Sequence, residues 1–165
     1  MPDTLPSSPA DRAPAADVAP YLPLRASRSL FVPVRGLRYH VRCWDAQPAA
    51  VQAAGGARTV FLLHGWMDVS ASFQFIVDEL PAHWRLLAPD WRGFGLTDRS
   101  GADTYWFPDY LGDLEGLLDA LAGDQAADVV AHSMGGNVAV LYAGVRPERM
   151  RRLVNLEGVG MPVSK

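Results

Sequence analysis

The stretch that decides the fold reads ValValAlaHisSerMetGlyGly, at residues 129–136. It joins an expected short strand at residues 128–132 to an expected helix at residues 134–145. A serine at such a junction sits on a sharp turn that lifts its hydroxyl clear of the sheet. The turn brings the strand and helix backbones so close that Ala131 and Gly135 must be small. Ser133 is therefore a candidate nucleophile, and the simpler alternative is that it only caps the helix.

Strands and helices alternate on both sides of this stretch. The expected strands are residues 59–64, 84–90, 128–132 and 150–156, and the expected helices are residues 70–80, 108–122 and 134–145. A continuous apolar run such as residues 59–64 indicates a strand that is buried on both faces. Alternating strands and helices predict an α/β fold with a mostly parallel sheet and helices on both faces.

The N-terminal part of the chain differs from this pattern. Residues 1–26 hold six of the 13 prolines and predict a disordered, Pro/Ala-rich tail. Residues 30–35 and 37–44 predict a hairpin, and a polar Ala/Gly-rich loop is expected to follow through residue 57. The length of 165 residues fits one domain, which we place at residues 27–165.

Composition excludes several classes of function. The formal net charge of −3 supplies no field for nucleic acid or an anionic membrane surface. The single cysteine, Cys43, rules out an intrachain disulfide, and no spacing of His, Asp or Glu resembles a metal site. No apolar run approaches the roughly 20 residues of a membrane span, and the start lacks a signal-peptide core. We therefore expect a cytoplasmic protein without cofactor or metal, whose partner is a small-molecule substrate.

Two further motifs follow expected strands, HisGlyTrpMet at residues 64–67 and AspTrpArgGlyPheGly at residues 90–95. With AlaHisSerMetGlyGly at residues 131–136, their order and spacing resemble the α/β-hydrolase superfamily. The resemblance is to the branch of lid-bearing esterases, epoxide hydrolases and haloalkane dehalogenases, and it covers residues 29–162. It implies the N-terminal part of that fold, with about six of eight strands and no lid domain.

The resemblance also implies roles for individual residues. Ser133 resembles the nucleophile, and the backbone N–H groups of Trp66 and Met134 resemble the oxyanion hole. The nucleophile elbow comprises Ala131, His132 and Gly135. Dehalogenases and epoxide hydrolases of this branch use an aspartate nucleophile, so a serine points to acyl transfer to water. Esters, thioesters, lactones and activated carbon–carbon bonds are the substrate classes that remain.

The loop that includes Arg92, Gly93 and Gly95 is expected to shape the rim of the site, and Asp90 to anchor that loop. Glu157, 24 residues after Ser133, resembles the triad acid of the dehalogenase-like branch. The alternatives are a loop-anchoring carboxylate at this position, or an acid that lies beyond residue 165.

None of the four histidines resembles the catalytic base. His132 adjoins Ser133, His64 belongs to the motif that supports the oxyanion loop, and His40 and His83 precede the nucleophile in chain order. We therefore expect a chain that lacks the lid and the late histidine, with at most trace activity. We also expect an unpaired sheet edge through which copies of the chain associate.

The leading prediction is a serine hydrolase that forms an acyl-enzyme on an ester-like small molecule. The alternative is a non-catalytic binding module or gene fragment that keeps the fold without turnover. A nucleotide-binding domain is disfavoured, because Gly93 and Gly95 lack a third glycine and do not open a helix.

Overall fold

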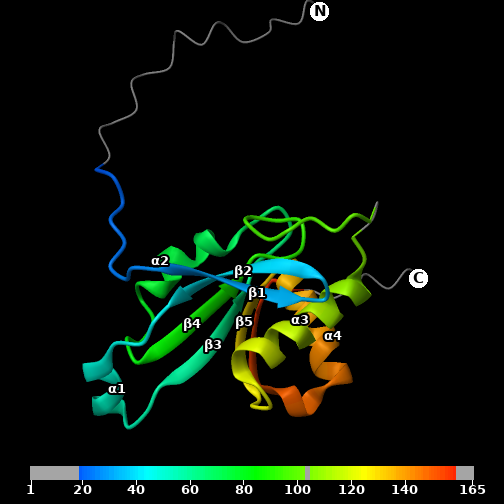
Figure 1. The fold of residues 1–165 in the computed structure, drawn as a ribbon. Helices are drawn as coiled ribbons and strands as arrows, with labels where there is room; N and C mark the ends of the chain where they lie inside the picture. The colour runs from blue at the N-terminus through cyan, green and yellow to red at the C-terminus, as the bar shows by residue number, and fades with distance from the viewer. Residues whose placement is uncertain (1–18, 103–104, 159–165) are drawn as a thin grey trace, which may run out of the picture.

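The computed structural model describes residues 19–102 and 105–158 of the chain (Figure 1). In chain order the elements are β1 (Arg28–Val34), β2 (Leu37–Trp44), α1 (Pro48–Ala54), β3 (Arg58–Leu63), η2 (Ser70–Phe73), α2 (Gln74–Val77), β4 (Trp84–Pro89), α3 (Phe107–Ala122), β5 (Ala127–His132), α4 (Met134–Val145), η3 (Pro147–Arg149) and β6 (Met150–Leu156). None of the helices in these residues is long and apolar enough to cross a membrane.

The strands form one six-stranded sheet in the order β1-β2-β4-β3-β5-β6. The β1–β2 and β2–β4 pairs are antiparallel, whereas β3, β4, β5 and β6 run parallel. This topology confirms the predicted α/β fold with a mostly parallel sheet. Parallel neighbours place the carboxyl ends of β3, β4, β5 and β6 at one edge, where the loops carrying the three motifs meet.

Alternating side chains of β3 divide the core into two layers. Phe61 and Leu63 pack in the cluster that includes the buried leucines of α3 and Val138 of α4. Val60 and Leu62 pack in the second cluster, with Phe73 and Val77 of η2 and α2. Helices thus cover both faces of the sheet, as the continuous apolar run of β3 predicts.

Two elements differ from the sequence-based expectation. The predicted loop before β3 contains a short helix, α1, which begins at Pro48 and ends against Gly55 in the left-handed conformation. The predicted helix at residues 70–80 is instead the 3-10 turn η2 followed by a single α-helical turn, α2. The α-helical turn ends at Val77, and after it the N–H groups of Glu79 and Leu80 bond three residues back, to Ile76 and Val77, so the segment continues only as tight turns.

The chain is held against the domain before the predicted boundary at residue 27. Residues 1–18 of the predicted tail lie outside the described residues. The Tyr21 hydroxyl and the backbone N–H groups of Leu24 and Arg25 all donate to the carboxylate of Asp78, just after α2. Arg25 is 7% exposed, and its guanidinium donates to the carbonyl oxygens of Asp45 and Trp84 at 3.2 and 2.8 Å. Residues 21–25 therefore pack against the domain next to the C-terminal end of α2.

Among the described residues the strand β6 pairs with β5 alone, so its outer edge has no neighbouring strand there. Val154 and Leu156 of this strand are 50% and 38% exposed. The association of copies through this edge stays a prediction.

Candidate active site

Ser133 occupies the sharp turn between β5 and α4. Its backbone has φ of 50° and ψ of −116°, a conformation that a residue with a β-carbon rarely adopts. Two backbone hydrogen bonds hold it there. The Ser133 N–H donates to the Leu156 carbonyl at 2.8 Å, and the Ser133 carbonyl accepts from Asn137 N–H at 3.0 Å. The side chain is half-buried, so the turn presents the hydroxyl at the carboxyl edge of the sheet.

Close packing around the turn explains why its neighbours are small. A β-carbon on Gly135 would lie 2.5 Å from the Leu63 carbonyl oxygen and 2.7 Å from that of His64. Both of these atoms belong to the backbone at the end of β3, which cannot yield as a flexible side chain can. Ala131, two residues before the serine, is fully buried. The sequence prediction that these two positions must be small therefore has a direct steric basis at Gly135.

The two predicted oxyanion donors come from different segments. Met134 is the first residue of α4, so its N–H has no acceptor within the helix. Trp66 lies in the loop after β3, is 53% exposed, and makes a T-shaped ring contact with Phe94. Met67, the next residue, has a φ of 54°. That Trp66 and Met134 jointly bind an oxyanion stays a prediction.

His64 ties the loop after β3 to the loop after β4. Its Nε2 accepts the Trp91 N–H at 2.9 Å, which leaves Nδ1 to donate to the Gly65 carbonyl at 2.7 Å. The Trp91 indole in turn donates to the His64 carbonyl at 3.0 Å. Burial lowers the pKa of His64, so the ring is held neutral. His64 therefore holds the loop after β3, which carries Trp66, against the loop after β4, in agreement with the structural role that the resemblance implies.

Asp90 holds the rim loop in place. Its carboxylate accepts the N–H groups of Ser70 at 2.6 Å and Leu96 at 2.9 Å, and it contacts His40 Nδ1 at 2.8 Å. Burial alone would raise the pKa of Asp90, but hydrogen bonds led by those from Leu96 and Ser70 outweigh it and lower the pKa. A β-carbon on Gly95, whose φ is 52°, would lie 2.1 Å from this carboxylate. The structure thus agrees with an anchoring role for Asp90.

A buried ion pair that sequence reasoning missed fixes the start of the same loop. The Arg92 guanidinium donates to both carboxylate oxygens of Asp113 in α3, at 2.5 and 2.6 Å. Tyr39 of β2 donates its hydroxyl to Asp113 at 2.5 Å and accepts the Arg92 N–H at 3.2 Å. In the sequence, the only sign of this ion pair was a charged residue, Asp113, within the leucine-rich helix.

Glu157 follows β6 directly and lies at the same sheet edge as Ser133. Its backbone has a φ of 58°, and its side chain is 85% exposed. The Asn155 side chain brackets it, since Asn155 accepts the Gly158 N–H at 2.9 Å and donates to the Gly158 carbonyl at 2.7 Å. This bracket was also missed from sequence, because nothing in a strand pattern distinguishes such an asparagine.

The four histidines fall into two groups. His40 contacts Asp90 and Ser29, His64 contacts Trp91 and Gly65, and His83 accepts the indole N–H of Trp84. His132 is the remaining one, and its Nε2 lies 3.8 Å from Glu157 Oε2. Within residues 19–102 and 105–158, no group of three or more His, Cys, Asp or Glu could hold a metal ion.

Comparison with known proteins identifies the family. The sequence profile of the alpha/beta hydrolase fold matches residues 58–164. A "serine hydrolase-like protein" of Danio rerio is 36% identical over 118 residues, covering 71% of this chain and 36% of that protein. A "2-hydroxy-6-oxo-2,4-heptadienoate hydrolase" of Pseudomonas putida is 36% identical over 110 residues, covering 65% of this chain and 40% of that protein.

A solved structure agrees with these sequence relatives. The epoxide hydrolase of Vigna radiata superimposes with a TM-score of 0.71 and 27% identity, over 84% of this chain and 40% of that one. The chain thus spans about two fifths of the length of the proteins it resembles. Because the profile covers most of the chain and both the topology and the turn at Ser133 agree with it, the chain belongs to the α/β-hydrolase fold family.

Proposed function

We propose that this chain carries the nucleophile, oxyanion and acid elements of a serine hydrolase that acts on an ester-like small molecule. Carboxylic esters, thioesters and lactones are the substrate class, because each can pass its acyl group to a serine and then to water. The observation that carries the proposal is the backbone of Ser133, held at a φ of 50° between β5 and α4. Helix capping alone does not require such a conformation, since a cap residue ordinarily has extended backbone angles.

In the proposed reaction, the Ser133 hydroxyl attacks the substrate carbonyl carbon and loses its proton to a general base. The N–H groups of Trp66 and Met134 stabilise the resulting oxyanion, an interaction whose loss typically costs about 10²–10³ in rate. Collapse expels the alcohol or thiol, which takes the proton, and leaves an acyl-Ser133 ester. Water then attacks this ester, again with base assistance, and releases the carboxylic acid.

Glu157 is the proposed orienting acid. Its place after β6 puts it at the sheet edge of Ser133, and the Asn155 bracket fixes the backbone around it. We propose that the base lies outside the four histidines of residues 1–165, on further polypeptide or on a partner chain. For His40, His64 and His83 this part of the proposal rests on their engagement by other groups. For His132, whose Nε2 lies 3.8 Å from Glu157, it rests on the position next to Ser133 in the chain, from which the side chain leaves the turn in a different direction from the hydroxyl.

The serine also separates this chain from some of its relatives. One relative in the comparisons is named an epoxide hydrolase, a class that the resemblance associates with an aspartate nucleophile. Another is named a 2-hydroxy-6-oxo-2,4-heptadienoate hydrolase. Hydrolysis of an activated carbon–carbon bond is the second candidate reaction, because it too can pass an acyl group to a serine. Ser133 supports acyl transfer through a serine for both candidate reactions, the hydrolysis of an ester-like bond and that of an activated carbon–carbon bond.

The test is labelling by a fluorophosphonate, which reacts with activated serines, on the protein purified from its own source. We expect one adduct, on the peptide that contains Ser133, and none after Ser133→Ala. Ser72→Ala is the matched control, because Ser72 lies in η2 and its hydroxyl contacts Asp68. Glu157→Gln should lower ester turnover by up to about 10⁴-fold.

Two results would contradict the proposal. A native protein that binds small esters without labelling or turnover would instead be a binding module. Ester hydrolysis that survives Ser133→Ala would place the nucleophile elsewhere.

A further inference from the structure

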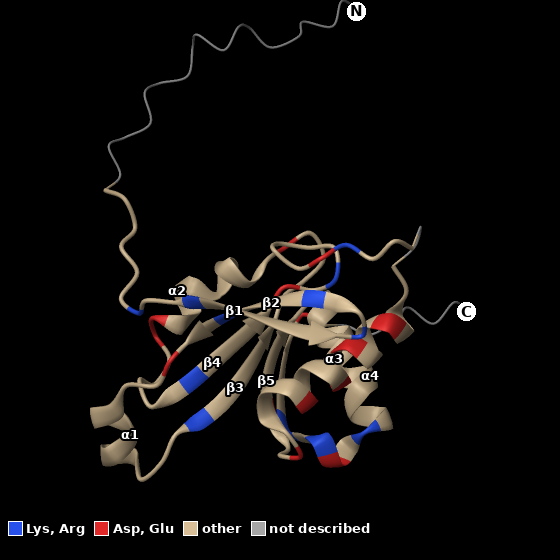
Figure 2. Cartoon of the chain, viewed as in Figure 1, with Lys and Arg blue, Asp and Glu red and all other residues tan. Residues whose placement is uncertain are grey.

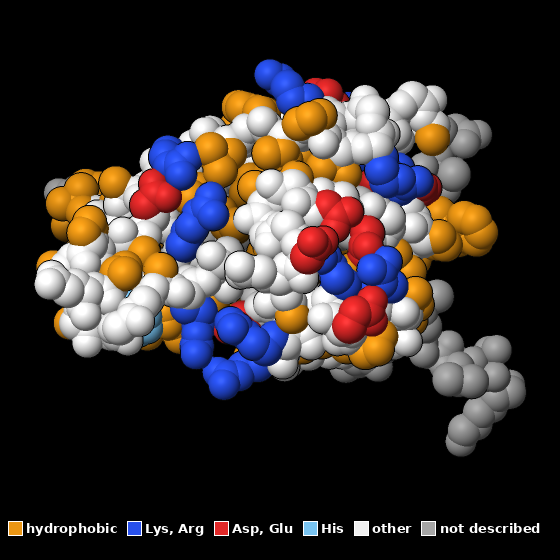
Figure 3. All heavy atoms as spheres, turned by 60° about the horizontal axis from the view of Figure 1, so that its bottom comes forward, with side chains coloured by type: hydrophobic (Ala, Val, Ile, Leu, Met, Phe, Trp, Pro, Cys, Tyr) orange, Lys and Arg blue, Asp and Glu red, His pale blue; other side chains and the backbone are white. Residues whose placement is uncertain are grey.

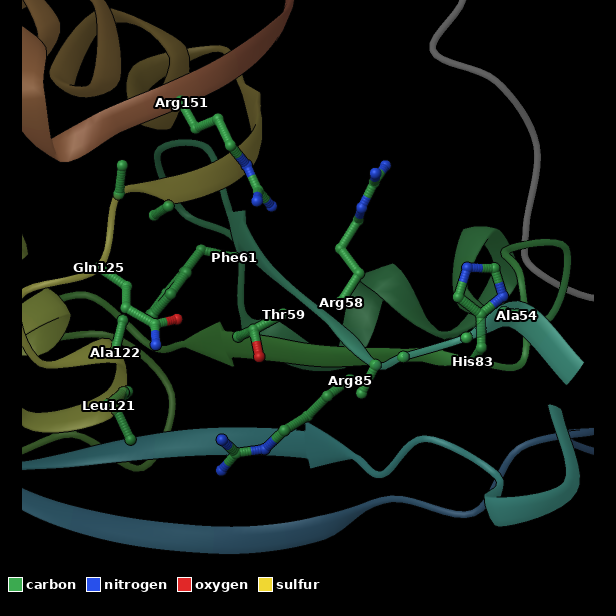
Figure 4. Close-up of a pocket in the computed structure, with 15 residues that line it drawn as sticks. Ala54, Arg58, Thr59, Phe61, His83, Arg85, Leu121, Ala122, Gln125 and Arg151 are labelled. Carbon is green, nitrogen blue, oxygen red and sulfur yellow. The ribbon is translucent and has the colours of Figure 1, made fainter. Parts of the chain in front are cut away.

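One cavity lies at the end of the strands opposite Ser133. It has a volume of about 530 Å³ and is lined where β3, β4 and β5 begin (Figure 4). Arginines of this region appear as blue bands at the starts of β3 and β4 in Figure 2, and blue side chains gather over the lower middle of the face in Figure 3. In Figure 4 Arg58 and Arg151 extend to one side of the strands and Arg85 to the other. These side chains therefore do not converge on one ligand.

A different group of polar side chains does converge, at the β1 side of the sheet (Figure 1). The Ser29 hydroxyl lies 2.8 Å from His40 Nε2, and His40 Nδ1 lies 2.8 Å from a carboxylate oxygen of Asp90. Ser29 belongs to β1, His40 belongs to β2, and Asp90 follows β4, the next strand in the sheet. The order hydroxyl, imidazole and carboxylate is that of a serine nucleophile with its base and its orienting acid.

Hydrogen bonding assigns a role to each nitrogen of the His40 ring. Burial would raise the pKa of Asp90, but the N–H groups of Leu96 and Ser70 bind its carboxylate and lower the pKa. The group is thus ionised at neutral pH and can only accept hydrogen bonds. His40 Nδ1 therefore donates to Asp90, and in the neutral ring Nε2 is left to accept the Ser29 hydroxyl. In this arrangement the imidazole can take the proton of the serine.

The three groups differ in their access to solvent. His40 is 0% exposed and Asp90 is 2% exposed, whereas Ser29 is exposed. The backbone of His40 is also held, because its N–H donates to the Thr97 hydroxyl at 2.9 Å and its carbonyl accepts the Asp90 N–H at 3.0 Å. The base and the acid are therefore shielded from water, while the hydroxyl can meet a reagent from solvent.

An aromatic ring lies next to this hydroxyl. Phe31 follows Ser29 by two residues in β1, so the two side chains stand on the same face of the sheet. The centre of the Phe31 ring lies 5.3 Å from that of His40, and the residue is 44% exposed. The Arg38 guanidinium lies 4.5 Å from the centre of the same ring. An exposed aromatic surface beside a nucleophile favours an aryl ester as the reacting molecule.

We propose that Ser29 is a second activated serine, which takes the acyl group of a small aryl ester and retains it. The Ser29 oxygen bonds to the carbonyl carbon, and its proton passes to His40 Nε2. The bond from that carbon to the aryl oxygen breaks, the phenolate leaves, and His40 returns the proton to the phenolate or to water. The product is an acyl-Ser29 ester. Water cannot reach the fully buried Nε2 past this acyl group, so no base assists hydrolysis of the ester.

This site is separate from the one proposed around Ser133. The strands β2, β4 and β3 lie between β1 and β5. Neighbouring strands are about 4.8 Å apart, which puts Ser29 on the order of 19 Å from Ser133. Ser29 also stands within a strand, whereas Ser133 precedes the N-terminus of α4. Without helix N–H groups to stabilise the phosphonyl oxygen, Ser29 is not expected to react with the fluorophosphonate.

The test is acetylation of the purified Ser133→Ala variant by p-nitrophenyl acetate, followed by tryptic digestion and mass spectrometry. Cleavage after Arg28 and Arg35 isolates residues 29–35, in which Ser29 carries the only side chain that an ester can acylate. We expect one acetyl group on this peptide. We also expect a single equivalent of p-nitrophenol that Ser29→Ala abolishes, without continued release.

Ser27 is the internal control, because it lies two residues earlier and its hydroxyl accepts from Arg42 at 2.8 Å. Cleavage before and after residues 26–28 places it on a separate peptide. Ser29 should be acetylated about 10²-fold faster than Ser27 or more, which is the typical contribution of a general base. His40→Gln removes the basic nitrogen but keeps a polar side chain, and it should slow acetylation of Ser29 by about the same factor.

Three results would overturn the proposal. The first is an equal rate of acetylation at Ser29 and Ser27, which would mean that the bond to His40 only fixes β1 against β2. This comparison needs no substitution at His40, so it does not depend on the folding of that variant. The second is an unchanged rate at Ser29 in His40→Gln, which would place the base elsewhere. The third is continued release of p-nitrophenol that Ser29→Ala abolishes, which would mean that the acyl group is not retained.

Discussion

Ser133 holds a backbone conformation that conflicts with its own side chain. A residue with a β-carbon at positive φ costs about 1–2 kcal/mol relative to its preferred region. Glu157, the other proposed catalytic side chain, also has positive φ, at 58°. Two of the four non-glycine residues with positive φ in the described chain are thus the ones proposed to react or orient. The backbone hydrogen bonds of Ser133 with Leu156 and Asn137 maintain the first, and the Asn155–Gly158 hydrogen bonds hold the backbone on both sides of the second.

The strain at Ser133 predicts an order of stabilities. The free energy of unfolding of Ser133→Gly should exceed that of Ser133→Ala by about 1 kcal/mol, because glycine adopts positive φ freely. Without strain the order would reverse, since glycine in an unstrained position is about 0.5–1 kcal/mol less favourable than alanine. Equilibrium urea denaturation of both variants measures the sign directly.

At the scale of elements, α4 is fitted to β3 through a glycine. Gly135→Ala places a β-carbon against the Leu63 and His64 carbonyl oxygens and should destabilise the chain by about 1–3 kcal/mol. Gly144→Ala, in the same helix, meets no atom within 4 Å and should stabilise it by about 0.5–1 kcal/mol. Thermal or urea unfolding of the two variants compares them. Equal effects would mean that helix propensity, and not the contact with β3, governs Gly135.

The elements that could be predicted from sequence are those with a local signal. Buried apolar runs identified β3 and β5, and leucines along one face identified α3. The helix α1 was missed because an Ala/Gly-rich segment has no apolar face, and its start depends on Pro48 in the first turn. The segment at residues 70–80 kept its buried Phe73 and Val77 but not its helical length, because the backbone bonds on both sides of α2 span three residues instead of four.

The candidate site divides in the same way. The elbow and its small neighbours are adjacent in the sequence, so the motif alone predicted the turn at Ser133 and the steric limit at Gly135. The Arg92–Asp113 pair joins residues 21 positions apart, and no periodic pattern signals it. The Asn155 bracket is local, yet it depends on side-chain geometry that a residue string does not specify.

At the scale of the whole molecule, Asp113 connects segments from three regions. Arg92 of the rim loop, Tyr39 of β2 and Arg35 of the β1–β2 turn all donate to its carboxylate. Asp113→Ala should therefore cost about 3–5 kcal/mol, because it leaves the buried Arg92 without its closest partner.

Asp109→Ala is the matched change one turn earlier in α3. Asp109 also pairs with Arg35 and Arg92, but its side chain is 34% exposed, so its loss should cost less than about 1 kcal/mol. Guanidinium chloride unfolding measures both variants. Similar losses would mean that the burial of the Asp113 pair adds nothing to its contribution.

The strand order has a consequence for synthesis on the ribosome. The strand β3 lies between β4 and β5, so it has both neighbours only after residue 132 has been translated and has left the exit tunnel. Until then β3 can pair only with β4, which in turn pairs with β2. The edge of β3 that will pair with β5 stays open. The nucleophile follows β5 by one residue, so the reactive turn and the completed centre of the sheet emerge together.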